Sequence, residues 1–218
     1  MELTAARLAE LAGGVVVGDP AATVGSFAID SRVLVPGSAF VALTAARDGH
    51  DFVAHAFAAG AAVAIVAREV TVPAGSTLVV VDDPLAAMAR VARGVHPPER
   101  RVVGITGSAG KTATKDLTAA ALGSALAVHA SPGSFNNEAG FPLTLLGAPD
   151  ATEIVVAEMG ARFPGNIADL CAVVQPRIGV ITHIGLSHAE HLGGREGIAA
   201  TKGELLELSL IHISEPTR

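Results

Sequence analysis

The sequence contains no tryptophan and no tyrosine, and only 3% of its 218 residues are aromatic. Hydrophobic residues nevertheless make up 50% of the chain. A core built from this composition must be aliphatic and rich in alanine. The length is sufficient for one large domain or two small ones.

Cysteine is almost absent as well, with Cys171 as the single example. One cysteine excludes an internal disulfide framework and is typical of proteins from a reducing compartment. Cys171 lies in the apolar stretch IADLCAVV, which favours a buried structural side chain over a reactive thiol.

Long apolar runs and strong positive charge are also missing. Mean hydropathy is +0.49, but the longest uncharged apolar run, residues 56–67, is shorter than the roughly 18 residues that a spanning helix needs. The N-terminal segment carries Glu2 and Glu10 in place of a basic leader, so no secretory signal is expected. The net charge of −6 argues against a nucleic-acid binder, because such proteins carry a basic patch. We expect a cytoplasmic protein without membrane insertion.

The pattern of apolar runs predicts two α/β domains. The runs at 61–67 and 77–82 are typical of strands that are buried on both faces, and a helix is expected from Asp51 to Gly60. The segment HPPERR, residues 96–101, combines two prolines with charge and is the best candidate linker. We therefore expect a small N-terminal α/β domain over residues 1–97.

After the linker, strand, loop and helix alternate regularly. Apolar strands at 102–106, 153–158 and 177–185 each lead through a polar loop to a helix. This alternation predicts a P-loop-type parallel sheet with crossover helices, in a second domain over residues 98–207.

The final segment, LSLIHISEPTR, does not continue the alternation. It resembles the conceptual translation of a sequencing adapter that is read in frame. We expect residues 208–218 to be non-native and the second domain to be incomplete, with a genuine C-terminus as the alternative.

The stretch TGSAGKT, residues 106–112, joins an apolar strand to a predicted helix. Its backbone N–H groups and the positive end of the helix dipole suit a phosphate. Lys111 would add charge at the terminal phosphates, and Thr112 would offer a hydroxyl ligand to Mg²⁺. The general P-loop pattern requires a glycine where Ile105 stands, so that pattern is only partly matched. An ordinary glycine-rich turn is the alternative.

Further candidates follow the next two strands. Glu158 ends an apolar strand, where a carboxylate faces the crevice in which open α/β sheets bind ligands. It is placed either to hold Mg²⁺ or to cap the next turn. His183, His188 and His191 cluster in THIGLSHAEHLGG, but without a cysteine partner they do not favour zinc.

Two loops offer polar groups to a ligand. Asn136 and Asn137 lie in a glycine-rich loop that leads into a helix, where their amides are available. Ser31 and Arg32, in IDSR, follow a strand and suit a diphosphate or a uracil edge. A surface turn is the alternative for the second pair.

Together these motifs resemble those of the Mur ligases, ATP-dependent enzymes that form amide bonds in the peptide of peptidoglycan. The glycine spacing of GITGSAGKT is that family's own form. GSFNNEAGFPLTLL, AEMGARFPGNIADL and SHAEHLGGREGIAATKGELL are most similar to the members that add D-alanyl-D-alanine. IDSRVLVPGSAFVAL is similar to the family's uridine-nucleotide domain. The resemblance covers nearly all of residues 1–207.

The resemblance implies a role for each matching position. Lys111, His188 and Lys202 would act in catalysis. Thr112, Glu158, His188 and Lys202 would serve the metal sites, with Lys202 as a carbamate. Ser31 and Arg32 would contact the uridine diphosphate. ATP would lie on the loop Thr106, Gly107, Ser108, Ala109, Gly110, Lys111 and Thr112, beside Asn136 and Asn137. GSFNN departs from the more frequent Gly-Asn-Leu-Asn-Asn form, which leaves open which asparagine contacts ATP.

The implied reaction uses ATP and Mg²⁺ to join D-alanyl-D-alanine to UDP-N-acetylmuramoyl-tripeptide through an acyl phosphate. The resemblance implies a cytoplasmic enzyme that is monomeric when complete. Family members carry a further C-terminal domain, so the chain as given is expected not to catalyse ligation alone. The alternatives are a diamino-acid-adding or cyanophycin-type ligase, and a nucleotide-binding module without chemistry.

Overall fold

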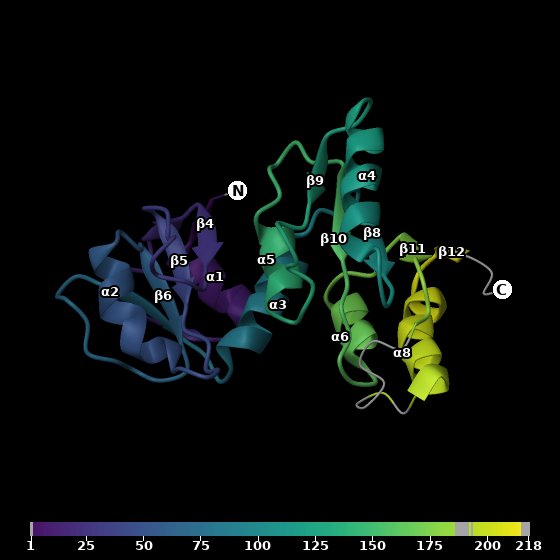
Figure 1. Ribbon diagram of the computed structural model, residues 1–218. Coiled ribbons are helices and arrows are strands. Elements are labelled where there is room, and N and C mark those ends of the chain that lie inside the picture. Colours follow the sequence, from purple (N-terminus) through teal and green to yellow (C-terminus); the bar gives the residue numbers. More distant parts are fainter. Residues whose placement is uncertain (1, 186–191, 193, 215–218) are drawn as a thin grey trace. The chain divides into compact units, whose positions relative to one another are not determined.

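The structure is a computed structural model that describes residues 2–185, 192 and 194–214. The chain divides into two compact units, Met1–Val95 and His96–Arg218 (Figure 1). Each unit is built on its own β-sheet, so the predicted α/β class is confirmed. Among the described residues, no helix has the length and apolar character that crossing a membrane requires.

The N-terminal unit contains a five-stranded mixed sheet in the order β2-β7-β6-β5-β4. Four strands run parallel, and they are β4 (Ser26–Ala28), β5 (Ser38–Val41), β6 (Val63–Val66) and β7 (Thr77–Val80). The edge strand β2 (Val15–Val17) is antiparallel to β7. Two short strands, β1 (Leu3–Thr4) and β3 (Thr23–Val24), form a separate antiparallel pair.

Helices cover this sheet, and their apolar faces pack against its buried strands. The helices are α1 (Ala5–Ala12), α2 (Val53–Ala58) and α3 (Pro84–Val95), with a 3₁₀-helix η1 (Gly49–Phe52) before α2. All residues of β5 and β6 are buried, and for β6 this confirms the prediction from its continuous apolar run. The packed cluster is aliphatic apart from one ring and consists of Phe40, Ala42, Val53, Ala56, Ala64, Val66 and Leu78.

The second unit contains a five-stranded sheet in the order β12-β11-β8-β10-β9, and every described pair is parallel. Its strands are β8 (Arg101–Thr106), β9 (Val128–Ala130), β10 (Ile154–Glu158), β11 (Ile178–Ile181) and β12 (Ile211–Ser214). Its helices are α4 (Lys111–Gly123), α5 (Gly140–Leu146), α6 (Asn166–Val173) and α8 (Gly194–Leu208). The predicted parallel sheet with crossover helices is therefore confirmed.

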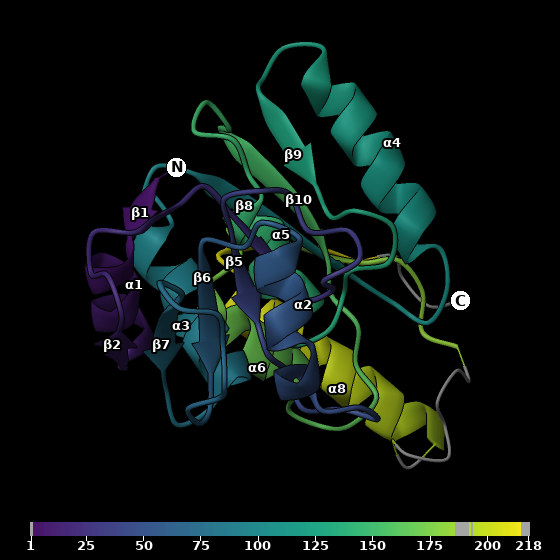
Figure 2. The same ribbon diagram turned by 90° about the vertical axis from the view of Figure 1, so that its left-hand side faces the viewer.

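Helix packing in this unit follows the same logic. Helix α4 runs alongside β9 and β10 (Figure 2), while α6 packs against α8. Strand β12 lies within residues 208–218 and pairs in parallel with β11. The non-native origin of that segment stays a prediction, because backbone pairing does not depend on where a sequence comes from.

A single carboxylate joins α6 to α8. Helix α6 begins after Gly165, which has no side chain to cap the exposed N–H groups. Glu204 on α8 supplies the cap: its two oxygens accept hydrogen bonds from the N–H groups of Gly165 (2.8 Å) and Ala168 (2.9 Å). Burial raises the pKa of Cys171 to about 12, and the same carboxylate contributes to this shift. This thiol is buried, as expected.

We expect Glu204→Ala to lower the free energy of unfolding by about 1 kcal/mol, because α6 loses its cap and the favourable charge at its N-terminus. Urea denaturation followed by circular dichroism measures the change. Faster amide exchange at Gly165 and Ala168 would locate it. Glu207→Ala, at an exposed position of the same helix, is the control and should change neither quantity. Equal effects of the two variants would contradict the capping role.

Candidate functional site

The candidate site lies at the carboxyl edge of the second unit's sheet. Strands β8 and β10 are neighbours, and their register pairs Glu158 with Ile105. The glycine loop follows β8 directly, and α4 begins at Lys111. Because parallel strands end at the same edge, the loop and Glu158 come together there.

The glycine loop is held from the side of β11. Gly107 has a φ of 150°, and a Cβ there would overlap the hydroxyl of Thr182, so only glycine fits. The Thr182 hydroxyl lies 2.6 Å from the carbonyl oxygen of Ala109 and 3.3 Å from that of Thr106. The N–H of Ser108 donates to the carbonyl of His183 at 2.8 Å. These bonds fix the loop between two strands.

The side chains of Lys111 and Thr112, in the first turn of α4, form two different hydrogen bonds at the site. The Lys111 ammonium donates to the carbonyl of Gly107 at 2.8 Å, within the loop itself. The Thr112 hydroxyl donates to Oε2 of Glu158 at 2.8 Å. The structure thus brings Glu158, from the end of β10, to the first turn of α4, which the sequence analysis placed on a separate segment.

The two asparagines of the predicted pair do different things. The amide of Asn136 donates to Oε1 of Glu158 at 2.7 Å, so it belongs to the site. The side-chain oxygen of Asn137 accepts from the N–H of Gly140 at 2.9 Å, next to the start of α5. Asn137 therefore orders the loop, and its contact with a nucleotide stays a prediction.

Glu158 is the centre of this arrangement. Its side chain is buried, and both oxygens accept hydrogen bonds. Its backbone N–H donates to the hydroxyl of Ser131 at 3.1 Å. A carboxylate beside a hydroxyl offers the hard oxygen ligands that Mg²⁺ prefers, and Mg²⁺ commonly keeps several water ligands. The site therefore fits Mg²⁺, although the described part of the chain holds no group of three or more His, Cys, Asp or Glu side chains suited to a metal.

Lys202 is buried on α8. Burial lowers the pKa of Lys202 to about 8, and the positive charge of Lys111 contributes to the same shift. A lysine with this pKa has an appreciable fraction of neutral, nucleophilic amine near neutral pH. His188, predicted to share the metal sites, lies outside the described residues.

In the N-terminal unit, the predicted pair Ser31 and Arg32 follows β4 at the carboxyl edge of the sheet. The Ser31 side chain is buried and its hydroxyl lies 3.0 Å from Nδ1 of His55. The exposed guanidinium of Arg32 forms an ion pair with Asp30, with a shortest distance of 2.6 Å. This guanidinium holds the pKa of Asp30 well below its usual range. Ser31 is thus a packed residue, whereas Arg32 presents its charge to solvent.

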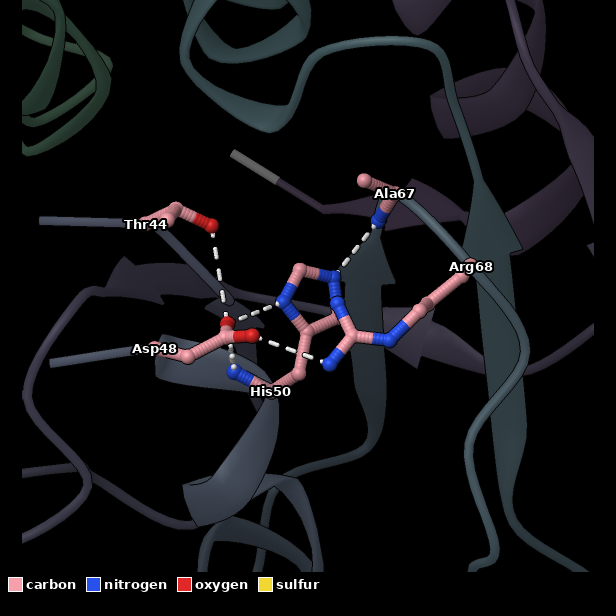
Figure 3. Close-up of polar contacts among 5 residues, drawn as sticks. All are labelled: Thr44, Asp48, His50, Ala67 and Arg68. Carbon is pink, nitrogen blue, oxygen red and sulfur yellow. Dashed lines mark hydrogen bonds and ion pairs between the residues drawn. The ribbon is translucent and has the colours of Figure 1, made fainter.

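Sequence reasoning missed a second cluster at this edge, centred on Asp48 (Figure 3). Its carboxylate accepts from the N–H of His50 (3.0 Å), lies 2.6 Å from the ring Nδ1 of His50, and accepts from the guanidinium of Arg68 (2.9 Å). These bonds, led by those to His50, hold the pKa of Asp48 below its usual range. The DGH triplet is the local signal that could have indicated the turn.

The geometry indicates the tautomer of the neutral His50 ring. Its Nε2 lies 2.8 Å from the backbone N–H of Ala67, which can only donate. Nε2 is therefore the acceptor, and the ring proton lies on Nδ1, facing Asp48. Through this buried ring the loops that follow β5 and β6 are joined.

Comparison with known proteins places these features in context. The Mur ligase middle domain matches residues 105–212. The UDP-N-acetylmuramoyl-tripeptide--D-alanyl-D-alanine ligase of Mycobacterium leprae is 43% identical over 94% of this chain and 46% of its own length. The enzyme of the same name from Bacillus subtilis is 44% identical over 82% of this chain and 40% of its own length. The chain spans about half the length of the curated relatives it matches.

Solved structures of MurF enzymes are similar to this chain as well. A crystal structure of MurF from Acinetobacter baumannii superimposes with a TM-score of 0.88 at 31% identity, over 98% of this chain and 49% of that one. The MurF ligase of Thermotoga maritima in complex with ADP gives a TM-score of 0.77 at 34% identity, over 87% of this chain and 45% of that one.

We expect His50→Ala to lower the free energy of unfolding by about 1–3 kcal/mol, because it leaves a buried space and removes the acceptor of the Ala67 N–H. Arg68→Ala is the matched control: it removes an exposed partner of the same carboxylate and should cost less. Urea denaturation measures both. Nitrogen-15 NMR should show the His50 proton on Nδ1 at neutral pH, and a proton on Nε2 would contradict the proposed bonding.

Proposed function

Because this chain belongs to the Mur ligase family, we propose that its two units serve an ATP-dependent ligase that joins D-alanyl-D-alanine to UDP-N-acetylmuramoyl-tripeptide. The observation that carries the proposal is the convergence of Lys111, Thr112 and Glu158 around the glycine loop. The relatives aligned along 94% of the chain bear the name of this reaction.

The glycine loop supports ATP as the phosphoryl donor. Lys111 now donates to the loop's own carbonyl at Gly107, and a phosphate oxygen is a stronger, charged acceptor for the same ammonium. The first turn of α4 adds its N–H groups and the positive end of its dipole. The loop residues Thr106 to Thr112 and the neighbouring Asn136 would then line the nucleotide.

Thr112 and Glu158 are the residues that would hold Mg²⁺, with His188 and a modified Lys202 at the further metal position. When bound, the ion would neutralise part of the negative charge of the ATP phosphates. Glu158 is prepared for this role because Thr112 and Asn136 hold its two oxygens in a fixed orientation.

The proposed reaction begins with the terminal carboxylate of the tripeptide. One of its oxygens attacks the γ-phosphorus of ATP in line, the bond to the β–γ bridging oxygen breaks, and ADP leaves with an acyl phosphate formed. The amine of D-alanyl-D-alanine then attacks the acyl carbon, phosphate departs, and the amine loses a proton as the amide forms. In this scheme Lys111 holds the phosphates, and catalysis depends mainly on positioning.

Lys202 suits conversion to a carbamate. The neutral amine can attack carbon dioxide, forming an N–C bond and releasing a proton. The charges of Lys111 and Lys202 repel each other, as the contribution of Lys111 to the lowered pKa of Lys202 indicates. Carbamylation removes this repulsion because it turns the Lys202 side chain into an anion. An anionic oxygen group there would be a further ligand for Mg²⁺.

The N-terminal unit would bind the uridine diphosphate. Arg32 presents an exposed guanidinium at the carboxyl edge of the sheet, and its planar fork suits phosphate oxygens. Ser31 would set the backbone of the same turn through its contact with His55. We propose a cytoplasmic enzyme, monomeric and without nucleic-acid partners.

The activity test uses the full-length protein that the source gene encodes. We expect it to release phosphate from ATP and to form the amide with D-alanyl-D-alanine in preference to a diamino acid. Lys111→Ala should reduce kcat/KM by about 100-fold or more, since a donor to the transferred charge is lost. Ser124→Ala, at the opposite end of α4, is the control and should retain activity. A preference for a diamino acid would favour another Mur-type ligase, and nucleotide binding without phosphate release would favour a binding module.

Carbamylation can be tested without turnover. After exposure to carbon-13-labelled carbon dioxide, NMR should show a carbamate signal that is absent from Lys202→Arg. At a fixed pressure of carbon dioxide the signal should grow as pH rises from 7 to 9, through the pKa of about 8, because the neutral amine is the reactive form. A signal that persists in Lys202→Arg would assign the carbamate elsewhere.

A further inference from the structure

Lys115 is a buried lysine that the reaction above does not use. It lies on α4 one turn after Lys111, and 3% of its surface is exposed. Its ammonium donates to the carbonyls of Ser131 (2.8 Å) and Gly133 (3.0 Å) and contacts the exposed carboxylate of Asp116 at 3.1 Å. All three N–H donors thus have a partner. Burying a cation is costly unless its donors are satisfied. These bonds therefore hold the Lys115 ammonium in place, and with it the backbone at Ser131 and Gly133.

The two carbonyls stand at the beginning of the loop that carries Asn136. This loop follows β9, and further along it is bound to the segment just after β10: the N–H of Gly160 donates to the carbonyl of Asn136 at 2.7 Å. The hydroxyl of Ser131 also accepts from the N–H of Glu158. Lys115 therefore ties α4 to a loop that is already attached to the strand ending in Glu158.

Two residues of α4 act on the same carboxylate from different sides. Thr112 and Lys115 are three positions apart and so share one face of the helix. Thr112 reaches Oε2 of Glu158 directly. Lys115 reaches the loop whose Asn136 donates to Oε1.

We propose that Lys115 is a positioning residue: it fixes the loop of residues 131–136 against α4, so that Asn136 and Thr112 orient Glu158 for the magnesium–nucleotide complex. The ammonium is suited to this because its three donors on a flexible stem can reach two carbonyls on different residues. The loop contacts stand on geometry alone, whereas the identity of the bound complex rests on the proposed function.

The test compares Lys115→Met with the wild-type chain. Methionine keeps most of the apolar stem and removes the three donors. We expect amide exchange in residues 131–137 to accelerate and the Kd for magnesium–ADP, measured by calorimetry, to rise by about 10-fold or more, as for groups that orient metal ligands. Asp116→Asn is the control: it removes the exposed partner and should leave both quantities nearly unchanged.

A double-mutant cycle separates positioning from general stabilisation. If Lys115 acts through Asn136, its substitution should weaken magnesium–ADP binding much less in an Asn136→Ala background than in the wild type. Additive losses would overturn the proposal. So would a Lys115→Met variant that melts earlier but keeps wild-type affinity and wild-type exchange in the loop.

A second variant keeps the test decisive if Lys115→Met does not fold. Lys115→Arg keeps the charge and several donors, and it should lose less affinity than Asn136→Ala, with the same non-additivity. Failure of the wild-type chain to bind magnesium–ADP would count against the proposed function, while the exchange rates of residues 131–137 would still decide the role of Lys115. Unchanged exchange in both Lys115 variants would refute it.

Discussion

The buried carboxylate of Glu158 is the constraint around which the second unit is organised. A carboxylate taken out of water must have its oxygens satisfied, and here the donors come from two other segments, the first turn of α4 and the loop after β9. Satisfying one side chain therefore fixes three chain segments relative to one another. The parallel sheet makes this possible, because it delivers the ends of β8, β9 and β10 to the same edge.

The N-terminal unit uses the same solution with different residues. Asp48 accepts bonds from the turn that contains it and from Arg68, and the His50 ring carries the connection on to the Ala67 N–H. Again a carboxylate near the ends of neighbouring parallel strands holds their loops together. Loops at such edges carry function but lack regular hydrogen bonding, so side chains must supply the order that a ladder of backbone bonds would give.

The sequence was informative wherever the signal was local. Continuous apolar runs predicted the buried strands, and the order of strand, loop and helix predicted the parallel sheet at whose edge the glycine loop and Glu158 lie. It was less informative about partners far along the chain. The helix expected from Asp51 instead begins as a 3₁₀ turn at Gly49, because Asp48 provides the cap. The partners of His50 and Lys115, like the separate tasks of Asn136 and Asn137, arise from tertiary contacts that no local pattern encodes.

The cap that Glu204 provides has a consequence for selectivity. Helices α4 and α6 both follow strands of the parallel sheet at its carboxyl edge, so each would present a free, positively polarised N-terminus to a polyanion. At α6 an internal carboxylate already occupies that position. A phosphate that binds at the start of α6 would have to displace the Glu204 carboxylate, which is part of the same chain and always close by. At the start of α4 no described side chain caps the N–H groups, and the nearby carboxylate of Glu158 is bound by Thr112 and Asn136 instead. Of these two helix N-termini, the fold therefore leaves that of α4 open to a polyanion.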